Sequence, residues 1–123
     1  MGKGVPNEPR APPPTPVQRR LRYRVCRTDP PTEFDFFSHF RRGIRLRQPT
    51  PRAIDLSKGV SLWETEEQAR ALALRFPHTG HYVAAVAVPD RVRQEGHPTS
   101  GHWNVWAEPE EMLTWVVQVV PVG

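Results

Sequence analysis

The chain has 123 residues, of which 17 are Lys or Arg and 13 are Asp or Glu, so its formal net charge is +4. At this length one folded domain is expected, because two separate hydrophobic cores need a longer chain. No apolar run approaches the roughly 20 residues of a membrane-spanning helix, and no apolar stretch follows the first residues as it does in a secretory signal. The composition therefore favours a soluble, cytoplasmic protein that does not contact a membrane.

Residues 1–19 are predicted to form a basic, proline-rich arm in front of a single folded domain over residues 20–123. Six prolines lie within residues 1–18. Because proline removes a backbone donor and fixes an extended geometry, this arm is expected to be disordered. Its residues 13–16 fit the P-x-x-P pattern of a ligand for an aromatic groove, with a plain linker as the alternative.

The first half of the domain shows one strand and one helix. Apolar and charged residues alternate over 21–26, which is typical of a half-buried strand. A capping box that begins at Thr32 predicts a helix over 33–42, closed by Gly43. Residues 47–58 look like an exposed connector that contains a short strand over 53–56.

The second half predicts a second helix and four further strands. A capping box at Thr65 opens a helix that runs to Phe76, after a short buried strand over 59–63. Residues 81–88 are apolar on both faces, which indicates a central strand. A polar loop over 91–101 precedes strands over 103–106 and 112–120. The pattern predicts a small α+β domain with a mixed sheet and two short helices.

Several chemistries find no support in the pattern. The five histidines lack the spacing of metal ligands, so no metal is expected and exposed turn histidines are favoured. The single Cys26 excludes an internal disulfide and is expected to be a buried thiol rather than a nucleophile. Neither a dinucleotide-binding glycine motif nor a phosphate-loop lysine is present.

Three polar elements, far apart in the sequence, fall on compatible strands. Arginines lie on the first strand at Arg24 and Arg27, and Ser61 lies on the strand before the second capped helix. An E-x-E pattern, Glu108 to Glu110, precedes the last strand. This order resembles the ADP-ribosyltransferase superfamily, in the branch that carries an arginine, a serine and an E-x-E glutamate, over about residues 21–122.

The resemblance implies transfer of ADP-ribose from NAD to an unidentified acceptor, as in a toxin or a regulatory modifier. Arg24, with Arg27 as second choice, would bind NAD and Ser61 would support it. Glu110 would be the catalytic acid, and Glu108 would help to activate the acceptor. The register of the glutamate is open among residues 108, 110 and 111, and residues 97–102 would correspond to the substrate-recognition turn.

Two other functions stay open. A non-catalytic module could use the basic front of the chain, residues 1–47 with a net charge of +7, to bind nucleic acid or an acidic protein. Tryptophans beside arginines could stack single-stranded bases. However, Trp103 and Trp106 point to opposite faces of a regular strand, so core packing is favoured for them. Trp63 and Trp115 are also expected to be buried. A small interaction protein with neither ligand is the third option.

Overall fold

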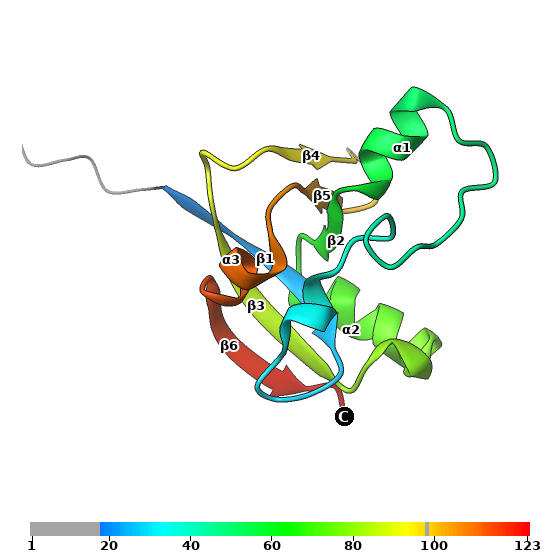
Figure 1. Cartoon of the computed structure of the whole chain (residues 1–123). Helices are drawn as coiled ribbons and strands as arrows, with labels where there is room; N and C mark the ends of the chain where they lie inside the picture. Colours follow the sequence, from blue (N-terminus) through cyan, green and yellow to red (C-terminus); the bar gives the residue numbers. More distant parts are fainter. Residues whose placement is uncertain (1–17, 98) are drawn as a thin grey trace, which may run out of the picture.

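The computed structural model describes residues 18–97 and 99–123, and these form an α+β fold around one antiparallel sheet of six strands (Figure 1). The predicted α+β class is confirmed, but the sheet of the described residues is not mixed, because all of its strand pairings are antiparallel. Apart from residues 18 and 19, the predicted proline-rich arm lies outside the described residues, and Arg19 already belongs to the first strand. The sheet order is β4-β5-β2-β1-β3-β6, with strands β1 (Arg19–Cys26), β2 (Val60–Trp63), β3 (Tyr82–Pro89), β4 (Gln94–Gly96), β5 (His102–Val105) and β6 (Val116–Pro121).

Short helices cover both faces of this sheet. The described residues contain three α-helices and two single turns of 3-10 helix, namely α1 (Pro51–Ser57), α2 (Glu66–Arg75), α3 (Pro109–Leu113), η2 (Glu33–Phe36) and η3 (Pro77–Thr79). Helix α2 packs on β1, β2 and β3, while α3 packs against η2. Helix α1 lies beside β2, β4 and β5, at the end of the sheet away from β6 (Figure 1).

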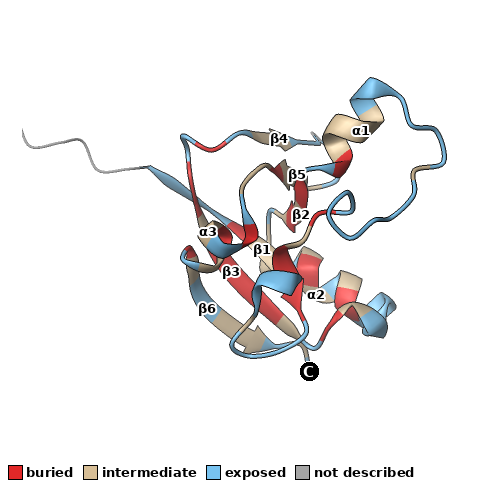
Figure 2. Cartoon of the chain, in the orientation of Figure 1, coloured by how far each residue is buried: buried red, intermediate tan, exposed pale blue. Residues whose placement is uncertain are grey.

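Two apolar clusters lie on opposite faces of the sheet. Val25 and Val83 pack with the small residues Ala69 and Ala73 of α2 on one face. The other face buries a larger cluster, which contains Cys26, Phe36, Leu62, Val86, Met112 and Trp115. Adjacent residues of a strand point to opposite faces, so β1 and β3 supply both clusters. Buried residues accordingly run along β3 and the sheet-facing side of α2 (Figure 2), which confirms the predicted central strand.

The second capping box is confirmed atom by atom. The Thr65 hydroxyl accepts a hydrogen bond from the Gln68 backbone N–H at 3.2 Å, and the Gln68 side-chain oxygen accepts one from the Thr65 N–H at 3.1 Å. Helix α2 ends at Arg75, one residue before the predicted end. The local signal was sufficient here because both partners of the box lie within four residues of each other.

The predicted helix over 33–42 is wrong, since η2 ends at Phe36. The Asp35 carboxylate accepts hydrogen bonds from the backbone N–H of Thr32 and of Arg27, both at 2.9 Å, which holds the segment against β1. Phe37 then takes an extended conformation, with ψ 131°, and the completely buried Phe36 anchors the turn. A longer helix would pull Phe36 out of the core. Gly43, at φ 74°, does occupy the predicted turn.

The connector predicted over 47–58, with its strand over 53–56, is also wrong. Helix α1 forms there because the Thr50 hydroxyl accepts a hydrogen bond from the Ala53 N–H at 3.1 Å and Pro51 occupies the first helical position. A hydroxyl residue at the N-cap followed by proline is a start signal that the sequence contained.

The last predicted strand, over 112–120, is shorter than expected. Helix α3 takes residues 109–113, with Pro109 in its first turn, and Met112 is completely buried on it. Strand β6 therefore begins only at Val116. In the same way the predicted polar loop over 91–101 contains the short edge strand β4, which pairs with β5.

We predict that Asp35→Asn destabilises the fold by about 1–3 kcal/mol, because an amide has only one oxygen to accept the two partly buried backbone N–H groups of Arg27 and Thr32. Urea unfolding followed by circular dichroism measures the change. The matched control is Glu33→Gln, at an exposed position of the same turn. Equal stability of the two variants would show that the Asp35 bonds do not hold this segment.

Candidate functional site

A cavity of about 870 Å³ lies between β1, β2, the 34–44 segment and the end of α2. We call it the cation cavity, after the arginines and histidines that dominate its lining: Arg24, Arg27, Arg41, Arg42, His39, His78 and His102. Three aromatic rings, Phe34, Phe37 and Trp63, and the hydroxyl residues Ser61 and Thr79 also line it. No described Asp or Glu contributes to this lining.

The cavity exists because β1 and β2 separate. A single register pair, Tyr23 with Trp63, joins these two strands, whereas β1 pairs with β3 along all eight of its residues. Arg24 lies just beyond the point where β1 and β2 part. Its Nη1 donates to the Ser61 carbonyl at 2.8 Å, and its Nε donates to the Asp35 carbonyl at 2.8 Å. The guanidinium thereby bridges β2 and η2 where the strand ladder stops.

The charge of Arg24 is not neutralised by any partner within the described residues. Both of its acceptors are uncharged carbonyls, and its Nη2 makes no hydrogen bond there. Burial lowers the pKa of Arg24, and Arg42 acts in the same direction, while Cys26 and the Asp35 carboxylate act in the opposite one. Arginine nevertheless stays protonated in proteins, so the side chain is a fixed and incompletely solvated cation. Such a group favours an anionic ligand.

The other arginines of the cavity lie over aromatic rings. The Arg27 and Arg42 guanidinium carbons are each 5.1 Å from the centre of the Phe34 ring, and that of Arg41 is 4.9 Å from the Phe37 ring. Stacking holds guanidinium groups without using up their N–H donors. Among the described residues, Arg27 and Arg42 have no ion pair, while Arg41 pairs with Glu108 at 3.3 Å.

Two histidines of the cavity are shifted toward the neutral form. Burial lowers the pKa of His39, as do Arg24 and Arg42. Burial also lowers the pKa of His102, with smaller contributions from His97, Arg24 and His39. The antiparallel pairing of β5 with β2 brings His102 opposite Trp63, and the two rings meet edge to face at 5.2 Å. Both imidazoles are therefore neutral at pH 7 and can donate or accept hydrogen bonds.

The structure brings together part of the predicted site. Arg24, Arg27 and Ser61 all line the cation cavity. Glu108 and Glu110 do not line it. Glu108 is the N-cap residue of α3 and Glu110 lies in its first turn, and both are exposed to solvent. Glu108 instead lines a neighbouring cavity of about 330 Å³ that shares Arg41. The third alternative, Glu111, forms an ion pair with Arg91 at 3.2 Å.

Sequence reasoning missed His39, Arg41, Arg42 and His102 as cavity residues. His102 was placed only in a loop that corresponds to a substrate-recognition turn. The strand predicted over 103–106 began one residue too late to include His102, which is the first residue of β5. Pairing of that strand with β2 is what brings His102 to the cavity. Arg41 and Arg42 were assigned to a helix end, and the shorter η2 frees them to line the cavity.

Cys26 takes no part in the cavity. Its side chain is completely buried, and burial raises the pKa of its thiol to about 12. The Sγ donates a weak hydrogen bond to the Arg24 carbonyl at 3.6 Å. The predicted burial of Cys26 is confirmed, and the raised pKa disfavours the reactive thiolate. Within residues 18–97 and 99–123 no group of three or more His, Cys, Asp or Glu is arranged to hold a metal ion.

Comparisons with known protein families, with characterised proteins and with solved structures find no match to this chain. Membership of the ADP-ribosyltransferase superfamily therefore stays a prediction from the sequence. None of the helices in the described part of the chain has the length and apolar character needed to cross a membrane.

The shifted histidines predict a loss of stability in mild acid. The pKa values of His39 and His102 lie below their ordinary 6.5 in the folded protein, so below about pH 6.5 the unfolded chain binds more protons than the folded one. The free energy of unfolding must then fall as the pH drops from 7.5 to 5.5. Urea unfolding at both pH values measures this fall.

His102→Gln should reduce the fall in stability, because the variant removes one group that takes up a proton on unfolding. The control His81→Gln changes an exposed histidine outside the cavity and should retain the full fall. An identical pH dependence in His102→Gln and the wild type would contradict the assignment of a neutral His102.

Proposed function

We propose that the protein binds a nucleotide pyrophosphate in the cation cavity, with NAD as its substrate for transfer of ADP-ribose. The observation that supports this proposal is the lining itself, which has four arginines and no described acidic residue. Arg41 is paired with Glu108, but Arg24, Arg27 and Arg42 have no ion pair within the described residues. These three like charges repel one another, and an anionic ligand with two phosphates would relieve that repulsion. NAD carries such a pyrophosphate between two planar rings.

The arginines suit phosphate in geometry as well as in charge. A guanidinium presents parallel N–H donors that match two oxygens of one phosphate. Arg24 is held from behind by the Asp35 and Ser61 carbonyls, so its orientation is fixed before a ligand arrives. Arg27 and Arg42, which stack on Phe34, keep their donors for a second phosphate.

The aromatic residues suit the planar parts of a nucleotide. Phe34, Phe37 and Trp63 line the same cavity as the arginines. Arginines already lie over Phe34 and Phe37, whereas no arginine of the described residues lies over Trp63, so its ring face can stack on an adenine or a nicotinamide. The cavity volume of about 870 Å³ falls within the roughly 300–1,000 Å³ of small-molecule sites. Shape and chemistry therefore agree on a ligand of nucleotide size.

The transfer step has weaker support than the binding step. In the ADP-ribosyltransferases that the sequence resembles, a glutamate stabilises the positive charge that develops on the ribose as nicotinamide leaves. A preorganised group of this kind lowers the barrier through electrostatics. Glu110 is exposed on α3 and outside the cavity, and Glu108 reaches only Arg41 at the cavity wall. The proposal therefore depends on Arg24 and its neighbours, and the glutamates are tested separately.

We predict that Arg24→Gln weakens the binding of NAD about 10- to 100-fold, because a hydrogen bond from a charged donor contributes about 1.5–3 kcal/mol. Isothermal titration calorimetry with NAD and with inorganic pyrophosphate measures the affinity. Arg27→Gln, at an exposed position of the cavity rim, is the second variant if Arg24→Gln loses stability, and it should also weaken the binding of NAD.

The control is Arg75→Gln, which removes an exposed charge at the end of α2 and outside the cavity. Unchanged affinity in both cavity variants, or an equal loss in Arg75→Gln, would refute the site. Release of nicotinamide from NAD then tests the transfer. If Glu110→Ala and Glu108→Ala release nicotinamide as fast as the wild type, neither glutamate is the catalytic group that the resemblance names.

Binding of single-stranded nucleic acid is the second candidate, and the exposed Phe34 ring favours it. Phe34 is 44% exposed, and the Arg27 and Arg42 guanidinium carbons each lie 5.1 Å from its ring centre, an arrangement that could stack a base beside a phosphate. This function predicts an affinity for an oligonucleotide that falls about linearly in log–log form with salt concentration. Fluorescence anisotropy at 50 and 200 mM salt measures it, and an affinity that does not change with salt would exclude this candidate.

A further inference from the structure

A second hollow continues from the cation cavity toward α1. It has a volume of about 400 Å³, and it shares His39, Ser61 and His102 with the cation cavity. Its other walls include Ala53, Leu56 and Ser57 of α1 and Asn104 of β5. We call this hollow the neutral lobe. A ligand that fills the cation cavity meets the lobe across the three shared residues.

The neutral lobe differs from the cation cavity in charge. No Arg, Lys, Asp or Glu of the described residues contributes to its lining, and its two histidines, His39 and His102, are the ones whose pKa burial lowers. A phosphate in this lobe would lose its hydration and would form no ion pair in return, which is unfavourable. The lobe therefore disfavours a second anionic group.

The lobe does offer hydrogen-bonding groups. The Asn104 amide, the Ser61 hydroxyl and the His39 imidazole make no side-chain hydrogen bond within the described residues. The register of β2 and β5 places Ser61 directly opposite Asn104, so both side chains lie on the same face of the sheet. An uncharged group with hydroxyl or amide substituents could pair with them.

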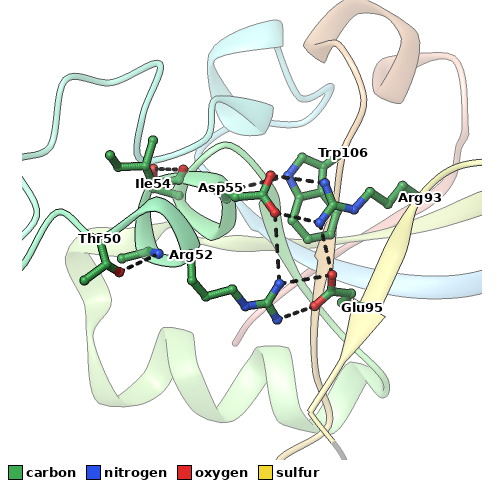
Figure 3. A network of polar contacts seen from close by, with 9 residues as sticks. Thr50, Arg52, Ile54, Asp55, Arg93, Glu95 and Trp106 are labelled. Atoms are coloured by element: carbon green, nitrogen blue, oxygen red, sulfur yellow. Dashed lines mark hydrogen bonds and ion pairs between the residues drawn. The ribbon is translucent and has the colours of Figure 1, made fainter.

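A network of polar contacts joins α1, which forms one wall of the lobe, to β4 and to residues next to β4 and β5. Asp55 of α1 receives two hydrogen bonds from Arg93, at 3.1 and 2.7 Å, and its carbonyl accepts one from the Trp106 indole at 3.0 Å. Glu95 of β4 joins Arg93 to Arg52 in the same network (Figure 3). The Arg93 guanidinium also stacks on Trp106 at 3.8 Å. Helix α1 is thus fixed to β4 and β5 independently of the cation cavity.

From this arrangement we propose that the ligand is a phosphate conjugate whose uncharged, hydrogen-bonding end occupies the neutral lobe while its phosphates occupy the cation cavity. The inference rests on the proposed function, because it assumes that an anion fills the cation cavity. It excludes polyanions as the preferred ligand, since a nucleic acid strand would place a further phosphate in the lobe. It equally predicts weak binding of free pyrophosphate, which leaves the lobe empty.

Filling the lobe with a side chain tests this inference. In Ala53→Phe a phenyl ring replaces the methyl group that lines the lobe from α1, while the arginines of the cation cavity stay unchanged. Calorimetry should show NAD binding at least tenfold weaker and pyrophosphate binding within twofold of the wild type. The matched control, Ala71→Phe, places the same ring on an exposed position of α2 outside both hollows and should change neither affinity.

Asn104→Ala is a second variant that adds no bulk, and it should also weaken NAD binding while sparing pyrophosphate. Failure of the wild type to bind either probe would overturn the proposed function and this inference together. Normal pyrophosphate binding with undiminished NAD affinity in both lobe variants would overturn this inference alone. An equal loss of both probes in Ala53→Phe, with the control unaffected, would also overturn it.

Discussion

The hydrogen bonds of Arg24 to the carbonyls of Asp35 and Ser61 are the interaction on which the rest of the site depends. They close the opening where β1 and β2 part and fix η2 against the sheet. Because both acceptors are neutral, they hold the side chain without cancelling its charge. The same contacts therefore stabilise the fold and leave a cation directed at a cavity, a combination that an Arg–carboxylate pair would not provide.

The charge of Arg24 also lowers the pKa values of neighbouring histidines. Besides burial, Arg24 lowers the pKa values of both His39 and His102. The result is a groove with permanent cations at one end and neutral imidazoles toward α1. An anion bound to the arginines would weaken this effect and favour protonation of the histidines, so ligand binding and proton uptake are linked. The charge gradient along the groove also orients a ligand that has one anionic and one uncharged end.

The predicted site residues on strands line the cavity, whereas the predicted glutamates do not, and the difference has a physical reason. Arg24, Arg27 and Ser61 lie in or directly after strands whose alternation was readable, and the cavity contains all three. Glu108 and Glu110 were placed at the start of a strand, but Pro109 begins a helix there and turns their side chains to solvent. The helix is favoured because it buries Met112, a long-range contact with no local signature.

By itself the sequence determined the α+β class, the central strand β3, the capped helix α2 and the buried Cys26. These follow from periodicity, from capping within four residues and from apolar composition, all of which are local. Only the tertiary structure decided the separation of β1 from β2, the pairing that brings His102 opposite Trp63, and the position of α1 at the end of the groove. Those features depend on contacts between residues 37 to 51 positions apart, whose free energies no short segment contains.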